Sequence, residues 1–233
     1  MKAPAPPAHE FEAPLSGEPP TVMTVTPEGK LEFTLTVLAL GPEQVKSVEQ
    51  WTGFLQFVFF LACFLMFIAS ANIVVGLILL CVYGWGSNVI EEWIDSAMRV
   101  ETRIVMTTAA ISVTSAGQSR HFDWNTEHSF SLVQHDRTKE EHLKNDLEER
   151  KASANGRVIQ KKAYFGESFH VVLSHAGHRR DIAEVYGHKE AAEIVARLVY
   201  CDRCLNEAAH MGGGIYQRPE DDWNQAPGGL RDA

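Results

Sequence analysis

The longest apolar run of the chain covers residues 51–86 and contains no charged side chain. One straight helix over this run would be about 54 Å long at 1.5 Å per residue, whereas the hydrocarbon core of a bilayer is about 30 Å thick. Helix tilt does not absorb so large an excess. The pattern therefore predicts two membrane spans, at about residues 51–69 and 73–90, connected by the small and polar residues Ser70, Ala71 and Asn72.

Aromatic and basic residues around the run indicate how such a hairpin is oriented. Tryptophan is enriched at membrane interfaces, and lysine and arginine are enriched on the cytoplasmic side. The predicted interface anchors are Trp51, Trp85, Trp93, Arg99 and Arg103. With Lys46 before the first span, they predict a multi-pass membrane protein with both termini in the cytoplasm. A buried helical hairpin in a soluble protein and a single long, kinked span are the two alternatives.

The chain before the apolar run has three predicted parts. Residues 1–20 are rich in Pro, Ala and Glu, lack the apolar stretch of a signal peptide and are predicted to be a disordered tail. Residues 21–40 alternate between apolar and polar side chains, which predicts a β-hairpin that must pair with the later domain or with a partner to be stable. A helix is predicted to begin at Pro42 and to lead into the transmembrane hairpin within residues 42–98.

Residues 99–210 are predicted to form a cytoplasmic domain. Alternating segments predict about seven short strands, one of them at residues 157–165, followed by an amphipathic helix at residues 188–210. A charged excursion at residues 138–152 interrupts the strands as a short exposed helix or a mobile segment. Residues 211–233 are predicted to be a second disordered tail.

These elements together predict a membrane-anchored α+β fold. A two-helix transmembrane hairpin is joined to an antiparallel β-barrel or two-sheet sandwich, and the C-terminal helix caps one open end of it.

Three stretches of the domain carry the pattern of strand, turn and helix most clearly: ISVTSAGQSRHFDW, FHVVLSHAGHRRDIAEVYG and HKEAAEIVARLV. Over about residues 100–205 this pattern resembles bacterial PH-like (PH domain-like) membrane proteins, in which two transmembrane helices are commonly joined to a PH-like domain. The resemblance implies a PH-like fold, a location in the bacterial inner (plasma) membrane and a role in assembly, scaffolding or regulation. It includes neither the charged excursion nor the N-terminal β-hairpin, and it does not imply phosphoinositide binding.

The formal net charge of −9 limits the partners of the chain. Nucleic acids are bound through clustered Lys and Arg, and the sequence has no basic run, so nucleic acid is excluded. Adhesion to anionic lipid through net charge alone is not expected either. The candidate interaction surface consists of two basic pairs, Lys161 with Lys162 and Arg179 with Arg180, although such pairs are often only the solvated face of a sheet.

Histidines and cysteines are the candidates for metal or redox chemistry. Four histidines recur at intervals of seven residues: His121, His128, His135 and His142. An odd interval places successive members on opposite faces of a strand, so we expect them not to converge on a metal. Cys201 and Cys204 form a CxxC near the end of the predicted C-terminal helix, where Cys201 falls on the apolar stripe and is expected to be a core residue.

The sequence therefore predicts a non-enzymatic protein without catalytic residues, cofactor or metal. Its partners are the lipid bilayer and other proteins of a membrane complex, and the chain could form homo-oligomers. The first alternative is an oligomeric small transporter or channel subunit, which needs polar groups that face each other inside the membrane, and Gln56, Ser70 and Asn72 are meagre candidates for them. The second is a metal-binding or redox regulator that uses the histidines and the cysteine pair.

Overall fold

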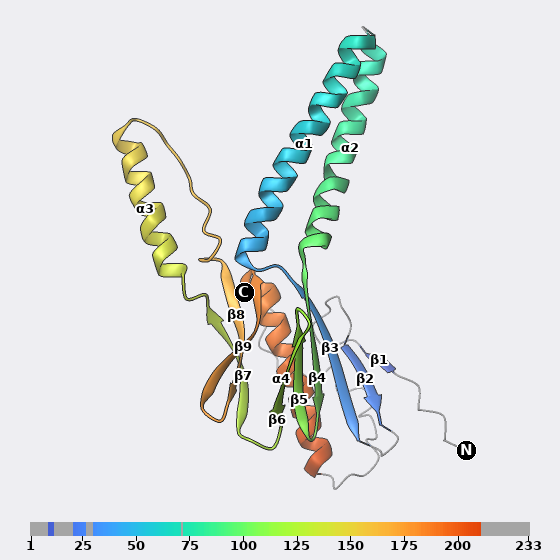
Figure 1. Cartoon of the computed structure of the whole chain (residues 1–233), viewed down its shortest axis with the longest axis vertical. Helices are drawn as coiled ribbons and strands as arrows, with labels where there is room; N and C mark the ends of the chain where they lie inside the picture. Colours follow the sequence, from blue (N-terminus) through green and yellow to red (C-terminus); the bar gives the residue numbers. More distant parts are fainter. Residues whose placement is uncertain (1–8, 12–20, 27–29, 71, 211–233) are drawn as a thin grey trace, which may run out of the picture.

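The computed structural model describes residues 9–11, 21–26, 30–70 and 72–210 (Figure 1). Three strands come before the apolar helices: β1 (His9–Phe11), β2 (Thr21–Val25) and β3 (Leu31–Ala39). The two apolar helices are α1 (Pro42–Ser70) and α2 (Ile73–Met98). The elements that follow are β4 (Val100–Thr107), β5 (Ala110–Ser115), β6 (Gln118–Asp123), β7 (His128–Gln134), α3 (Thr138–Ala154), β8 (Ser168–His175), β9 (His178–Tyr186) and α4 (His188–His210).

The strands form two antiparallel sheets. β1 to β6 are neighbours in chain order in a six-stranded sheet, and β7 to β9 form a three-stranded sheet. The first sheet combines strands from both sides of the helical hairpin, because β3 pairs with β4 from Glu32 opposite Thr107 to Ala39 opposite Val100. The N-terminal strands therefore pair with the later domain, and the hairpin is an insertion between two neighbouring strands of one sheet.

β3 forms a strand because its side chains alternate strictly between core and surface. Leu31, Phe33, Leu35, Val37 and Ala39 are all buried, whereas the residues between them are more exposed. This period of two is the pattern that the sequence predicts for the second half of the N-terminal hairpin, and the structure confirms it. The buried face of β3 is part of one core that also includes β4, β5, β8 and β9.

Helix α4 covers this core along one apolar stripe (Figure 1). Ala191, Leu198, Cys201 and Leu205 have no measurable exposure. Their spacing of three, four or seven residues places them on one face of a helix. The predicted C-terminal helix and its amphipathic stripe are thus confirmed with the same bounds.

The apolar run forms two antiparallel helices, not one long span (Figure 1). Asn72 is the N-cap of α2, where its Oδ1 accepts a hydrogen bond from the backbone N–H of Val74 at 2.9 Å. Both helices are long and apolar enough to cross a membrane. Of the most apolar 18-residue stretch of each helix, 11% is buried in α1 and 0% in α2. The Ser70 hydroxyl donates to the Phe67 carbonyl at 3.0 Å. Ser70 and Asn72 are therefore both used within the hairpin itself.

The predicted strand at residues 157–165 is wrong. After Gly156, whose φ of +69° lies in the left-handed region, residues 157–163 run as irregular chain, and a turn covers residues 164–167. Residues 157–160 are all exposed, so the alternation has no buried face to occupy. No strand in the described part of the chain lies beside this segment to complete a ladder.

Six strands, one fewer than predicted, therefore follow the hairpin among the described residues. Of the two predicted arrangements, the described strands form two sheets and do not close into a barrel. The charged excursion is a helix, α3, as the first of its two predicted alternatives states. Within the predicted N-terminal tail, β1 pairs with β2; residues 1–8, 12–20 and 211–233 lie outside the described residues.

The pairing of β3 with β4 predicts that a core substitution before the hairpin destabilises the domain after it. We expect Phe33→Ala to lower the free energy of unfolding of the whole two-sheet domain by about 3–5 kcal/mol, because Phe33 is 1% exposed and lies opposite Met106. Thermal or denaturant unfolding of the purified chain in detergent measures this loss. It is followed by the fluorescence of Trp124 in a chain whose other four tryptophans are replaced by phenylalanine.

Thr34→Ala, on the less buried face of the same strand, is the matched control and should change the stability by about 1 kcal/mol or less. If both substitutions left the unfolding of the later strands unchanged, the N-terminal strands would be an independent unit.

Candidate functional site

The junction between the helical hairpin and the sheets concentrates the long-range polar contacts of the molecule. On the side of α2, one arginine connects three elements. Arg99 is the C-cap of α2 and binds Asp95 at 2.9 Å, donates to the Leu38 carbonyl of β3 at 3.1 Å and lies 3.5 Å from a Glu190 oxygen of α4. This arrangement fixes the end of α2 against the start of α4 and the end of β3.

On the side of α1, two acidic residues in its first turns receive contacts from distant loops. Glu43 pairs with Arg137 at 3.2 Å. Glu49 pairs with Lys162 and accepts a hydrogen bond from the Tyr164 hydroxyl at 2.5 Å. Burial alone would raise the pKa of Glu49, but the bonds from Lys162 and Tyr164 lower it, and the bond to Glu49 raises the pKa of Tyr164 to about 12. The first turns of α1 are therefore held by charge-assisted contacts.

Glu141 holds helix α3 to the same junction. Its carboxylate accepts three backbone hydrogen bonds, from the N–H groups of Tyr164, Phe165 and Gly166, at 2.9, 2.7 and 2.9 Å. The ring of Phe165 lies beneath the Arg137 guanidinium, with 4.2 Å between the guanidinium carbon and the ring centroid. The turn before β8 thus binds α3 and, through Tyr164, α1.

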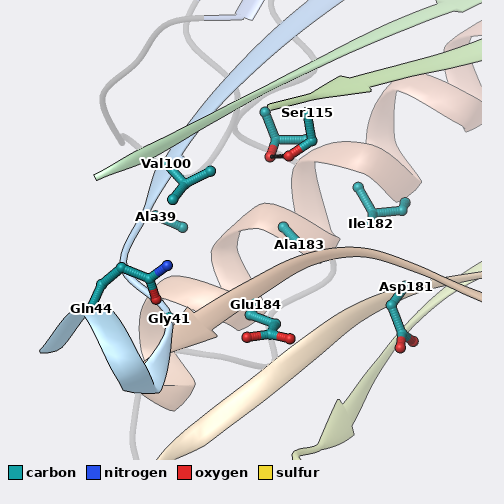
Figure 2. Close-up of a pocket in the computed structure, with 10 residues that line it drawn as sticks. Ala39, Gly41, Gln44, Val100, Ser115, Asp181, Ile182, Ala183 and Glu184 are labelled. Atoms are coloured by element: carbon teal, nitrogen blue, oxygen red, sulfur yellow. Dashed lines mark hydrogen bonds between the residues drawn. The ribbon is translucent and has the colours of Figure 1, made fainter. Parts of the chain in front are cut away.

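A cleft of about 240 Å³ lies at the foot of α1, between β9 and the ends of β3, β4 and β5 (Figure 2). Asp181 and Glu184 extend from β9, Gln44 extends from α1, and Ser115 accepts a hydrogen bond from Thr102 at 3.1 Å across the upper wall (Figure 2). The charged lining is acidic, and Asp181 already binds Arg179 at 2.9 Å. Such a cleft suits a small cationic or hydrogen-bonding group.

Gly41 allows the chain to turn from β3 into α1 beside this cleft. A Cβ added at Gly41 would lie 2.6 Å from Gln44 Oε1 and 3.3 Å from Glu184 Oε2. A larger residue at this position would therefore require the flexible end of the Gln44 side chain to move.

Two histidines and a carboxylate come together beside the cleft. The rings of His135 and His170 stack with centroids 4.5 Å apart, and with Glu184 they offer ligand atoms within 4.8 Å of one another. His170 is buried, and its Nδ1 has no hydrogen-bond partner and lies 3.9 Å from Asp181. By residue type, this set of two histidines and one carboxylate could bind a transition metal.

The hydrogen bonds of His135 argue against a metal at this cluster. Its Nδ1 accepts a bond from the backbone N–H of Arg137 at 3.1 Å. A neutral ring that accepts at Nδ1 carries its proton at Nε2, so neither nitrogen presents a free lone pair, whereas a metal ligand normally donates its second N–H. Burial and the neighbouring His170 lower the pKa of His135. The cluster therefore fits a stacked histidine pair better than a metal centre.

The four histidines spaced by seven residues do not converge, as their odd spacing predicts. His121 on β6 bonds Ser112, and His142 lies on α3. His128 bonds Asp202 of α4 at 3.0 Å, and only His135 belongs to the cluster beside the cleft.

The CxxC is part of the core. Cys201 and Cys204 are buried, and burial raises the pKa of the Cys201 thiol far above its usual range. Between them, Asp202 accepts hydrogen bonds from Trp124 Nε1 at 2.9 Å and from His128. The motif therefore contributes core packing through its cysteines and, through Asp202, polar contacts with the chain from the end of β6 to the start of β7.

The predicted interaction and interface residues are distributed over several places. Lys161 pairs with Glu148 at 2.8 Å and Lys162 pairs with Glu49. Arg179 pairs with Asp181 and Asp136, and Arg180 is exposed on β9. Three of the four basic side chains are therefore used in ion pairs within the molecule. Arg103, on β4, lies opposite Thr36 and Thr114 in the sheet.

The three candidate tryptophans are all exposed. Trp51 lies 19 residues before the end of α1, and Trp93 lies 20 residues after the start of α2. They are thus at one height of the hairpin. Trp85 lies eight residues before Trp93, or about 12 Å farther from the sheets.

Comparison with known proteins assigns no relative to this arrangement. No protein-family model matches the chain, and neither a curated protein nor a solved structure is significantly similar to it. The function must therefore be inferred from the junction, the hairpin and the sheets themselves.

The three bonds to Glu141 predict a local effect on the turn that they hold. Glu141→Gln removes the charge that strengthens these bonds, and we expect amide hydrogen exchange at Tyr164, Phe165 and Gly166 to become about tenfold faster. Hydrogen exchange with mass spectrometry measures this rate. Glu140→Gln, the same change at the exposed neighbouring residue, should leave it unaltered; equal rates in both variants would contradict the role of Glu141.

The lowered pKa of His135 predicts a loss of stability in mild acid. In the unfolded chain, His135 titrates near its ordinary pKa of about 6.5, whereas in the folded chain its pKa is lower. Between these two pKa values the unfolded state therefore binds more protons than the folded state. The contribution of neutral His135 to the free energy of unfolding is complete above about pH 6.5 and is lost as the pH falls through the pKa of His135 in the folded state. Denaturant titrations over this window should give a shallower pH dependence for His135→Asn than for the unchanged chain; parallel curves would contradict it.

Proposed function

We propose that the chain is a non-enzymatic protein of the bacterial inner membrane, in which a two-helix hairpin anchors a docking domain at the cytoplasmic surface. The observation that carries this proposal is the combination of length, apolar composition and exposure in α1 and α2. At most 11% of the most apolar 18-residue stretch of each helix is buried, so the hairpin has a large apolar surface that the described chain does not cover. A bilayer is the environment that such a surface fits.

The orientation of the hairpin is supported by the sheet from which it projects. Ala39 and Val100 are cross-strand partners, so both ends of the hairpin are on one side of the bilayer. The flanking basic residues Lys46, Arg99 and Arg103 are at this end, which supports a cytoplasmic location. Trp51 and Trp93, at one height of the hairpin, suit the interface, and Trp85 then lies within the hydrocarbon.

A PH-like fold for the docking domain is supported by the order of its strands. β3 to β6 are four consecutive antiparallel strands in one sheet, β7 to β9 are three in the other, and α4 follows directly. The backbone N–H of Tyr186 at the end of β9 donates a hydrogen bond to the carbonyl of Leu40 at 2.7 Å, and Leu40 directly follows β3. The last strand, β9, therefore meets the end of β3. In this reading, the hairpin is inserted between the first two strands of a PH-like domain.

Docking is the activity for which the domain offers surfaces. β6 lies at the edge of the six-stranded sheet, pairs only with β5 among the described strands and has almost entirely exposed side chains. An edge strand can receive an extended segment of another protein through backbone hydrogen bonds. The hairpin would hold this edge at the membrane and raise its local concentration near other membrane proteins, as a scaffold, assembly or regulatory module does.

The membrane anchor predicts that the chain behaves as an integral protein. We expect alkaline carbonate extraction to leave it in the membrane fraction of the expressing cells, because both helices of the hairpin are long and apolar enough to cross the hydrocarbon core. Release of the intact chain into the soluble fraction would contradict the anchor.

The docking edge predicts a position-dependent cross-link. A photo-reactive amino acid at Arg120 on β6, activated in native membranes, should capture one defined set of membrane-complex subunits, because this edge is exposed. The same probe at Lys139, an exposed residue at the base of α3, is the matched control. Capture of the same proteins from both positions would contradict docking at β6. Capture of only a second copy of the chain would favour the oligomeric channel, and ion flux would then be the next measurement.

A further inference from the structure

The end of α3 and the chain that follows it form the most basic segment of an acidic protein. Residues 150–162, defined here as the α3 tip, contain five basic residues and no acidic one: Arg150, Lys151, Arg157, Lys161 and Lys162. The whole chain has a formal net charge of −9. The net charge of the tip is therefore positive, whereas that of the whole chain is negative, and this positive charge attracts anionic groups.

The tip is on the same side of the sheets as the helical hairpin. α3 rises beside α1 in the direction in which the hairpin leaves the domain (Figure 1). The ion pair of Lys162 with Glu49 fixes the return of the tip two residues before Trp51, which is the start of the first apolar span. Contacts at the base of α3, through Glu141, hold the helix in this direction.

The tip also exposes apolar side chains at its turn. Val158 is 95% exposed and the neighbouring Ile159 is 37% exposed. Lys161 and Lys162 are used in ion pairs with Glu148 and Glu49, whereas Arg150, Lys151 and Arg157 are on the exposed surface around the turn. Exposed aliphatic side chains among Lys and Arg are the combination by which peripheral segments bind an anionic bilayer surface.

We infer that the α3 tip binds the anionic lipid headgroups of the bilayer that holds the hairpin, with Val158 and Ile159 inserted at the interface. This inference rests on the proposed function, because the hairpin must cross that bilayer. The tip gives the domain a second contact with the membrane, away from the hairpin. Two separated contacts fix the tilt of the sheets relative to the bilayer, and so fix the direction in which β6 faces.

The test uses the full chain in nanodiscs made of phosphatidylcholine alone or of phosphatidylcholine with phosphatidylglycerol. A fluorescent amino acid replaces Gln160 in the tip, and a lipid with a nitroxide at the headgroup quenches it on contact. The same fluorophore at Phe57, an exposed residue of α1, reports whether the hairpin is in the bilayer. Both positions are measured at low and at high salt.

We expect the tip probe to be quenched in the discs that contain phosphatidylglycerol and to lose this quenching in high salt. The double variant Lys151→Gln/Arg157→Gln should weaken the contact roughly tenfold. Lys139→Gln/Lys144→Gln removes the same charge from the lower half of α3 and should leave the contact unchanged. Val158→Ser/Ile159→Ser should also weaken it, because inserted apolar surface is lost.

Each other result overturns the inference. If the hairpin probe contacts lipid but the tip probe is unquenched in both kinds of disc, the tip inference fails and the membrane anchor stands. If the tip is quenched equally without phosphatidylglycerol and in the Lys151→Gln/Arg157→Gln variant, the anionic headgroups are not what it binds. If the hairpin probe itself does not contact lipid, the proposed function fails together with the inference.

Discussion

Eight residue pairs between β3 and β4 hold the two ends of the helical hairpin side by side. Because Ala39 and Val100 are cross-strand partners, α1 must leave the sheet and α2 must return to it at one point. The Arg99 contacts fix the end of α2, and the Glu43 and Glu49 contacts fix the start of α1. The direction of the hairpin, the cleft at its foot and the position of α3 beside it all follow from this pairing.

Local patterns were sufficient to predict the elements that bury or expose one face. Each of these patterns depends on side chains a few residues apart and can therefore be read from the sequence. They are the apolar run, the alternation of β3 and the apolar stripe of α4. The segment at residues 157–165 shows why such patterns fail. It has the residue types of a strand, but a strand also needs a neighbour and a buried face, and the structure provides neither among the described residues.

The contacts that build the junction could not be predicted in this way. Glu141 receives hydrogen bonds from residues at least 23 positions away, and Asp202 receives one from a residue 78 positions away. Neither residue has a local signal, because an acidic residue on a helix surface looks the same with or without distant donors. The candidate pairs Lys161 with Lys162 and Arg179 with Arg180 were visible as charges, but three of these four side chains are used in ion pairs. Net charge, likewise, conceals the local excess of basic residues at the end of α3.

The burial of α4 against β3 has a consequence for biosynthesis. β3 is made early and leaves the ribosome before β4 exists, while α4 is among the last described elements to appear. Leu198, Cys201 and Leu205 cover the same core as Phe33 and Leu35, so this core is incomplete until the chain has been synthesised past residue 205. The nascent chain must therefore keep the apolar face of β3 uncovered, and the edge that later pairs with β4 open, while the helical hairpin is made. During this interval β3 is exposed to aggregation and to chaperones.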